Sequence, residues 1–186
     1  MHWLDTAPDF ATDLDKAFRS SGVSLTLADP SMPDAPLVAV NDAFCEMTGY
    51  TPEQALGRNC RFLQPSGGAG PVRQRMREFL KDDGSDEDKF VVPNVTREGR
   101  EFLNLVYMNK LRRDGEVILI LGSQFDVSGK SATAVDMYET ALREDVRQIG
   151  KVAGEQGAVM IGSYTSLASS HAIIARARLE RKEARS

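Results

Sequence analysis

Carboxamide side chains recur where the sequence predicts β-strands, and they are the first indication of a binding site. Between residues 88 and 127 the chain alternates apolar and polar positions in three runs joined by short turns, which is typical of antiparallel strands. Asn94, Asn104 and Gln124 each share a strand face with bulky apolar residues. Because a carboxamide both donates and accepts hydrogen bonds, three of them on one apolar wall suit a planar polar ligand. Each amide would equally suit a neighbouring backbone group, so alone they predict only an α+β domain with a cavity.

The opposite face of the same strands is apolar as well. Leu103 and Leu105 alternate with the amide positions of one strand, and Val117 and Leu119 do so in the next. Strict alternation places Ile118 on the amide face. With one face lining a pocket, the other must be covered, and we expect a helix or a second subunit there.

The cysteines and the composition exclude several classes of protein. Cys45 and Cys60 have neither metal-ligand spacing nor a neighbouring histidine, so no zinc site or disulfide framework is indicated. The 186 residues are 41% hydrophobic with a net charge of −4, unlike a disordered chain or a basic nucleic-acid-binding protein. The first residues lack the basic head and apolar run of a secretory signal, and we expect a cytoplasmic protein.

Hydrophobic spacing predicts the elements that position these side chains. Leu4, Phe10, Leu14 and Phe18 follow helical spacing before Gly22. We predict strands over 23–29, 36–40, 88–96, 101–111 and 116–127, and helices over 4–18, 41–50, 51–56, 71–82, 132–152 and about 163–185.

The resulting fold is α+β: a five-stranded antiparallel sheet with short helices on one face and helical extensions at both ends. We divide the chain into an N-terminal amphipathic helix (1–20), a core (21–128) and a C-terminal helical extension (129–186) that serves signal relay or dimerisation.

The C-terminal extension contains an uncharged stretch, residues 156–175, of the length that a bilayer span requires. Its serines and His171 argue against a membrane helix. Apolar residues at four-three spacing instead predict a helical seam or a partner-binding stripe, with His171 as a tolerated seam residue. The stripe comprises Met160, Tyr164, Leu167, His171 and Ile174. The basic tail contains no complete helix-turn-helix unit, so we expect neither a nucleic-acid nor a membrane partner.

One short motif is far more specific than these patterns. Residues 57–64, GRNCRFLQ, resemble the signature of light-oxygen-voltage (LOV) domains, the flavin-binding photoreceptor branch of the PAS fold. The resemblance covers residues 20–128. The whole chain looks like a short LOV protein, in which the protein's own helices carry the signal. The other matching positions are Asp29-Pro30, Pro33-Asp34, Pro36, Phe44, Thr48-Gly49-Tyr50, Asn94, Gly99, Asn104 and Gly122-Ser123-Gln124.

This resemblance implies a blue-light photoreceptor, not an enzyme, that binds FMN, with riboflavin as the alternative. In such domains light drives the sulfur of the motif cysteine, here Cys60, onto flavin atom C4a while N5 gains a proton, and the adduct breaks in the dark. Gln124 would face N5 and O4 and relay the change in hydrogen bonding toward the terminal helices. Cys45, beside Phe44 in a predicted helix, is expected to be a small core residue.

The resemblance also implies which side chains contact the flavin. Amides would bind the polar ring edge and the ribityl chain, arginines the phosphate, and aliphatic side chains the ring faces. The implied set is Asn59, Arg61, Leu63, Gln64, Arg73, Arg77, Leu80, Asn94, Asn104, Val106, Met108, Ile120 and Gln124. Arg75 lies on another side of its helix, and we expect it to be a solvated surface residue.

Four positions depart from the family pattern. Ala28 and Ala35 stand where many relatives carry Thr and Asn, Pro65 replaces a common Gly, and Pro93 interrupts a strand. These departures concern binding strength and the lifetime of the light state rather than the photochemical core.

Two other functions remain open: a light-insensitive PAS ligand sensor and a flavin oxidoreductase. The oxidoreductase is opposed by the lack of a dinucleotide-binding fingerprint, and the ligand sensor has no use for Cys60 within the motif. For partners, we expect a homodimer through the outer sheet face and the terminal helices, and an unidentified downstream protein.

Overall fold

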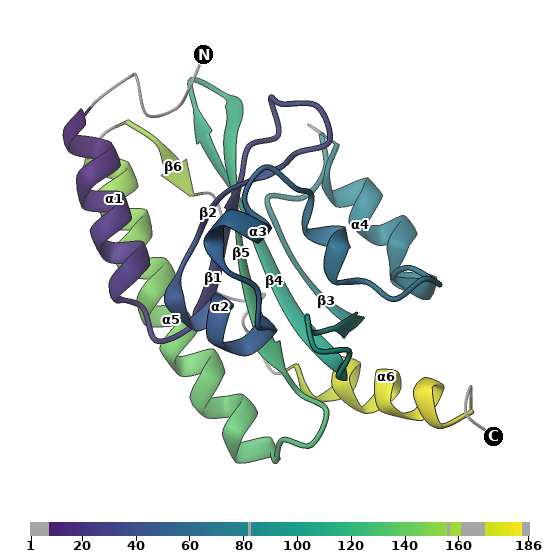
Figure 1. The fold of residues 1–186 in the computed structure, drawn as a ribbon. Helices are drawn as coiled ribbons and strands as arrows, with labels where there is room; N and C mark the ends of the chain where they lie inside the picture. The colour runs from purple at the N-terminus through teal and green to yellow at the C-terminus, as the bar shows by residue number, and fades with distance from the viewer. Residues whose placement is uncertain (1–7, 82, 156, 161–169, 184–186) are drawn as a thin grey trace.

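An antiparallel sheet forms the centre of the fold in the computed structural model, which describes residues 8–81, 83–155, 157–160 and 170–183 (Figure 1). Its strands are β1 (Ser24–Ala28), β2 (Leu37–Val40), β3 (Glu87–Val95), β4 (Glu101–Arg113) and β5 (Glu116–Asp126). They lie in the order β2-β1-β5-β4-β3, and a two-residue strand, β6 (Val159–Met160), pairs with β4. The predicted five-stranded antiparallel sheet is confirmed, and β6 is an addition that the sequence pattern does not indicate.

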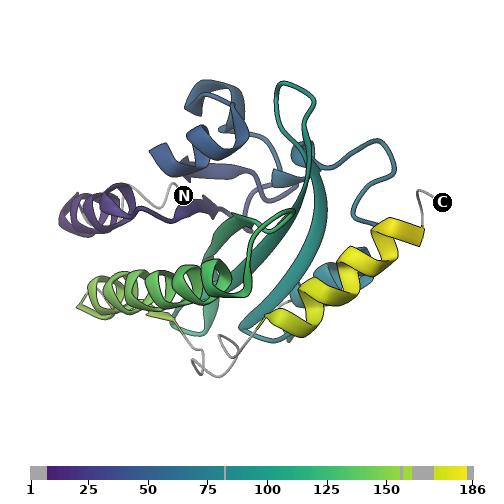
Figure 2. The same cartoon turned by 90° about the horizontal axis from the view of Figure 1, so that it is seen from below.

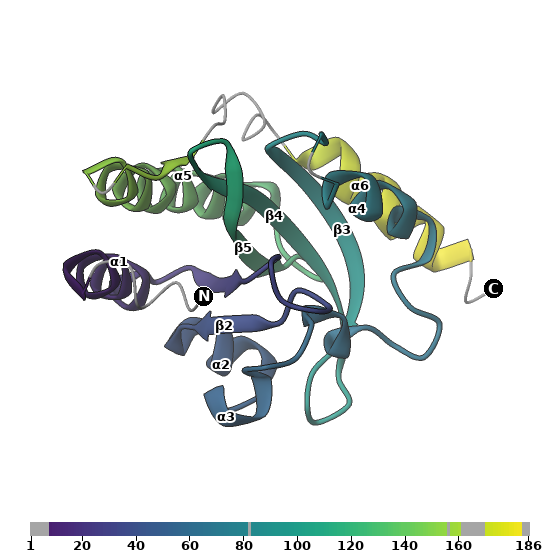
Figure 3. The same ribbon diagram turned by 90° about the horizontal axis from the view of Figure 1, so that it is seen from above.

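Helices lie on both sides of the sheet. The inner face, which carries the amides, is flanked by α2 (Asp42–Thr48), α3 (Pro52–Ala55), the 3-10 helices η2 (Cys60–Leu63) and η3 (Gly70–Val72), and α4 (Arg73–Phe79). On the other side, the outer face, lie α5 (Ala132–Glu155) and α6 (His171–Glu183), with α1 (Pro8–Ser20) beside α5 (Figures 2 and 3).

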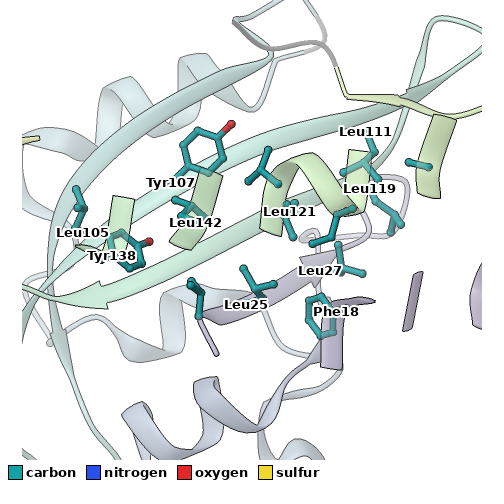
Figure 4. Close-up of a cluster of buried hydrophobic side chains, with 14 of the residues drawn as sticks. Phe18, Leu25, Leu27, Leu105, Tyr107, Leu111, Leu119, Leu121, Tyr138 and Leu142 are labelled. Atoms are coloured by element: carbon teal, nitrogen blue, oxygen red, sulfur yellow. The ribbon is translucent and has the colours of Figure 1, made fainter. Parts of the chain in front are cut away.

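The main hydrophobic core lies between the outer face and these longer helices (Figure 4). Leu25, Leu105 and Leu121 from the sheet meet Phe18 of α1 and Leu142 of α5, all at most 1% exposed. Each such side chain contributes about 1.5–3 kcal/mol by leaving water. Of the two covers expected for this face, a helix or a second subunit, the structure shows helices of the same chain.

A β-bulge changes which side chains share a face at the start of β5. The pairing of β4 with β5 shifts register between Leu111 and Arg112, so that Arg112 opposes Val117. One extra residue reverses the alternation beyond the bulge. Ile118 therefore packs against the outer core and Val117 against the inner cluster, the opposite of the predicted assignment.

Capping residues set the bounds of the short inner helices. The Asn41 side chain accepts from the backbone N–H of Phe44 at 3.1 Å and starts α2. Gly49 ends that helix with φ of 77°, a conformation that glycine adopts without strain. Thr51 and Gln54 form a capping box at α3. The helices predicted over 41–50 and 51–56 are confirmed.

The C-terminal helix departs from its prediction. Ser170 is not helical and α6 begins at His171, while Met160 lies in β6, so the predicted stripe is not one helix face. Tyr164 and Leu167 lie outside the described residues, as do Leu4 and the side chain of Phe10. Within the described ranges, no helix combines the length and the hydropathy of a membrane span.

Candidate functional site

A cavity of about 340 Å³ lies between the inner face of the sheet and the segment from η2 to α4. This volume is within the range of small-molecule sites. The cavity brings together Cys60 and twelve of the thirteen implied flavin contacts: Asn59, Arg61, Gln64, Arg73, Arg77, Leu80, Asn94, Asn104, Val106, Met108, Ile120 and Gln124. The exception is Leu63, which is fully buried beside Leu37 and Phe44 and is not part of the cavity lining, so its implied flavin contact stays a prediction.

Two of the amides lie side by side on neighbouring strands. Asn104 donates from Nδ2 to Asn94 Oδ1 at 2.8 Å, and Asn94 donates to the carbonyl of Pro93, also at 2.8 Å. Asn104 Oδ1 accepts from the backbone N–H of Phe125 at 3.1 Å. Both side chains are at most 5% exposed and line the cavity. They form a polar wall whose hydrogen bonds are made within the protein, as expected if strand amides bond to neighbouring groups rather than to a ligand. The same wall nevertheless faces a space large enough for a ligand.

Gln124 differs from this pair because one end of its amide is left over. Its Nε2 donates to Thr26 Oγ1 at 3.0 Å across the neighbouring strand β1. Its Oε1 is buried and has no hydrogen-bond partner in the described part of the chain. Leaving a buried carbonyl oxygen unpaired costs about 1–3 kcal/mol. A hydrogen-bond donor on a bound ligand would remove this cost.

Cys60 begins η2 at the cavity wall, directly after the capping residue Asn59. Asn59 Oδ1 accepts from the backbone N–H of Arg61 at 3.0 Å, and its Nδ2 donates to the carbonyl of Asp34 at 2.6 Å. The motif is thereby tied to the turn between β1 and β2. Burial raises the pKa of the Cys60 thiol to about 12, so the side chain is a protonated thiol at neutral pH.

The second cysteine has a structural setting. Cys45 is half-buried in α2 and packs against the cluster around Phe44, away from the cavity. Burial, followed by the nearby acidic side chains, raises its pKa as well. This agrees with the predicted role as a small core residue.

Three arginines lie along one side of the cavity and differ in what they bind. Arg61 pairs with Asp34 at 2.6 Å, and both side chains are more than half exposed. Arg73 and Arg77 are exposed and form no ion pair with any residue that the structure describes. Arg75 lies outside the cavity lining and pairs with Asp88 at 3.0 Å, as expected of a surface residue.

Further residues, most of them small, complete the cavity lining, and the sequence patterns gave most of them no role in binding. Ala28 and Ala35 were noted only as departures, and here they border the cavity with short side chains. Thr26 opposes Gly122 in the pairing of β1 with β5, a register that joins strands about 100 residues apart. The other residues that the sequence analysis missed are Leu37, Ala69, Met76 and Val92.

The departure at Pro93 has a simple structural explanation. Pro93 lies in β3, which is an edge strand of the sheet and, among the described strands, pairs with β4 alone. An edge strand tolerates the missing N–H because one side of the strand has no neighbour to receive it.

The cavity suits a flat ring with a polar edge and an anionic tail. Three buried amides offer donors and acceptors. Within the part of the chain that the structure describes, the Gln124 oxygen lacks a donor, and two arginines without ion pairs lie along the same lining. A flavin mononucleotide has this combination of groups, and the residues fit it. Among the described residues, no group of His, Cys, Asp and Glu side chains is arranged to hold a metal ion.

Comparisons with known proteins agree with this geometry. The PAS domain family matches residues 23–129. Phototropin-2 of Oryza sativa subsp. japonica is 35% identical over 122 residues, which is 64% of this chain and 13% of the phototropin. Blue-light-activated histidine kinase 1 of Erythrobacter litoralis is 37% identical over 114 residues, 59% of this chain and 30% of the kinase. The chain thus spans less than a third of these relatives.

A solved structure extends the likeness beyond the core. The crystal structure of the Rhodobacter sphaeroides LOV protein is 33% identical, with a TM-score of 0.78, and the match covers 95% of this chain and 99% of that protein. The LOV domain of an Erythrobacter litoralis blue-light activated histidine kinase is 34% identical with a TM-score of 0.53, covering 57% of this chain and 96% of that domain. The chain therefore belongs to the PAS domain family, and within it to the LOV photoreceptors.

Proposed function

We propose that this LOV protein senses blue light with FMN bound in the cavity, Cys60 acting as the photoactive thiol and the terminal helices carrying the response. Riboflavin remains the alternative chromophore. The observation that carries the proposal is the placement of one thiol opposite three strand amides within a single cavity, with arginines along its lining.

When bound, the flavin absorbs blue light and offers ring atom C4a to the Cys60 sulfur and N5 to the thiol proton. Cys60 supplies both atoms, because its raised pKa keeps the proton on the sulfur at neutral pH. No outside oxidant or reductant is needed, and the reverse step returns the thiol. The cycle therefore has no net turnover, and we propose that the chain is a sensor rather than an enzyme.

The polar wall and the arginines would hold the chromophore in place. Asn94 and Asn104 exchange their mutual hydrogen bond for bonds to the polar ring edge. Arg73 and Arg77 bind the phosphate, and Arg61 joins them by releasing Asp34. That release costs little, because ion pairs between exposed side chains contribute about 0–1 kcal/mol.

Gln124 would pass the change at the ring into the sheet. Its unpaired Oε1 is an acceptor, and protonation of N5 creates a donor. The residue lies two positions before Asp126, the last residue of β5, and α5 follows at Ala132. A change in the Gln124 amide therefore acts on the strand that leads into the C-terminal helices.

For the assembly, we propose a homodimer that uses the terminal helices rather than the outer sheet face. Exposed apolar side chains remain on α5 and α6: Met137 is 70% exposed and Leu179 is 62% exposed. Light scattering in darkness and under illumination tests this. A monomer at tens of micromolar in both conditions would contradict it.

The photochemistry is tested by the absorption spectrum of the purified full chain. We expect a structured blue band that bleaches under blue light and returns in the dark. Cys60→Ala should retain the band without bleaching, whereas Cys45→Ala, the matched control, should behave as the wild type. A flavin oxidoreductase would instead oxidise reduced nicotinamide in the dark, and a light-insensitive ligand sensor would show no bleaching at all.

A further inference from the structure

The C-terminal helix reaches back to the segment that joins the sheet to α5. We call residues 127–131 the hinge segment, since they lie between the end of β5 and the start of α5. From α6, Arg178 Nη2 donates to the carbonyl of Lys130 at 2.9 Å and also to the carbonyl of Val127. One guanidinium thus binds the hinge segment at its first residue and again at Lys130, about 50 residues away in the sequence.

On its other side, the hinge segment is bound to the sheet. The N–H of Val127 donates to the carbonyl of Leu103 at 2.9 Å, and Ser128 Oγ accepts from the N–H of Leu103 at 2.8 Å. Asp126, which precedes the hinge segment, pairs with Arg100 at 2.7 Å. The hinge segment is therefore held between β4 and α6.

The start of α6 is fixed by a buried ion pair. Lys89 of β3 lies 3.3 Å from Glu139 of α5, and both side chains are 8% exposed. Ser170, directly before α6, accepts from Lys89 Nζ at 3.0 Å and donates its N–H to Glu139 at 2.9 Å. Such a pair contributes little net stability, but its geometry specifies one docking position for the helix.

The body of α6 is docked by packing and by a second arginine. Ile174 is 3% exposed in the outer core, and Arg181 pairs with Glu101 of β4 at 3.0 Å. In Figure 2, α6 runs along the outer side of β3, away from α5. With its first turn fixed and its middle bound to the hinge segment, α6 spans the outer edge of the sheet.

We propose that α6 acts as a strap. In the dark it restrains the hinge segment against the sheet, and Arg178 is the residue that connects the helix to that segment. The coupling to light rests on the proposed function, whereas the restraint in the dark does not. A light-driven change at Gln124 that moves Asp126 would separate the hinge carbonyls from Arg178 and loosen the second half of α6.

Hydrogen exchange of the full chain in the dark tests the restraint. Arg178→Met keeps the aliphatic stem and removes the donors, and Arg178→Lys keeps the charge but replaces the planar guanidinium with a shorter ammonium group. Arg176→Met is the matched control, because the Arg176 side chain is 82% exposed and its one ion pair within the described ranges is with Glu180 on the same helix. We expect exchange at the amides of Val127, Ser128 and Val135 to become about tenfold faster in Arg178→Met, equal to about 1.4 kcal/mol of opening free energy.

Arg178→Lys should fall between Arg178→Met and the wild type, and Arg176→Met should match the wild type. The amides of Leu105 and Leu121, deep in the core, should exchange as in the wild type in every variant and so report intact folding. The proposed restraint is contradicted if the hinge amides of both Arg178 variants exchange at the wild-type rate. It is also contradicted if Arg176→Met accelerates their exchange as much as Arg178→Met does.

Illumination of the flavin-loaded protein tests the coupling. Light should accelerate hinge exchange in the wild type and add less than about twofold in Arg178→Met, whose hinge segment is already released. An equal light-induced acceleration in both proteins would overturn the coupling. A wild type that shows no light response anywhere would contradict the proposed function, while the dark comparison still decides the restraint.

Discussion

The hydroxyl of Thr26 accepts a hydrogen bond from Gln124 Nε2 at 3.0 Å, across the central pair of strands on the inner face of the sheet. Gly122 lies directly opposite Thr26 in the register and two residues before Gln124, and a Cβ added there would lie 2.7 Å from Thr26 Oγ1. The absence of a side chain at position 122 is therefore what allows Thr26 to reach the Gln124 amide.

Gly122→Ala should destabilise the fold by about 1–3 kcal/mol, because Thr26 must shift in a packed sheet. The same substitution in a Thr26→Ala background should cost less, since the obstructing hydroxyl is gone. Denaturant unfolding of the two single variants and the double variant measures this coupling. Strictly additive losses would show that Thr26 and Gly122 do not constrain each other.

Gln124→Leu should retain bleaching but lose the light-dependent change at the hinge segment. Leucine fills similar space, yet it neither donates to Thr26 nor accepts from a donor in the cavity. Light-minus-dark hydrogen exchange is the measurement, with Gln64→Leu as a control that removes another cavity amide, at the C-terminal cap of η2 instead of in β5. A wild-type response in Gln124→Leu would mean that the signal leaves through Asn94 or Asn104.

Arg73→Gln and Arg77→Gln should each weaken FMN binding by about tenfold or more, because a charge-assisted hydrogen bond contributes about 1.5–3 kcal/mol. Riboflavin, which lacks the phosphate, should bind both variants as it binds the wild type. Arg75→Gln should change neither affinity, since Arg75 pairs with Asp88 outside the cavity lining. Equal losses for FMN and riboflavin would contradict a phosphate role for Arg73 and Arg77.

Alkylation of Cys60 in the flavin-free protein should depend steeply on pH. A thiol reacts as its thiolate, and a pKa of about 12 leaves the folded thiolate scarce at pH 8. The rate should therefore rise about tenfold per pH unit from pH 8 to pH 11 and level only above the folded pKa, whereas in urea it should level near the reference value of about 8.5. Cys60→Ser reports the Cys45 background. A folded-state rate that levels near pH 9 would show that burial does not suppress the thiolate.

The inner face could be predicted from the sequence because strand alternation and short turns are local signals. Asn94, Asn104 and Gln124 line one cavity as their spacing suggests, and the caps at Asn41 and Thr51 bound their helices. Alternation failed only where it was interrupted. The bulge beside Val117 depends on how the hairpin pairs, which residue types there do not reveal.

Long-range pairing explains the remaining differences. Thr26 reaches the site through the register of β1 with β5, and Leu63 packs beside Leu37 and Phe44 without joining the cavity lining. An apolar outer face predicts that something covers it, but not whether α5 or a second subunit does so. Uncharged residues near position 160 allow a strand as well as a helix, and pairing with β4 selects the strand β6.

The S–H stretching band in the infrared spectrum reports the Cys60 thiol itself, and it therefore tests whether this thiol takes part in the photochemistry. Blue light should remove the Cys60 contribution to this band, and darkness should restore it. Cys45→Ala should show the same reversible loss, and Cys60→Ala should show none. Persistence of the wild-type Cys60 band while the blue absorption bleaches would contradict the account, because the thiol would then take no part in the photochemistry.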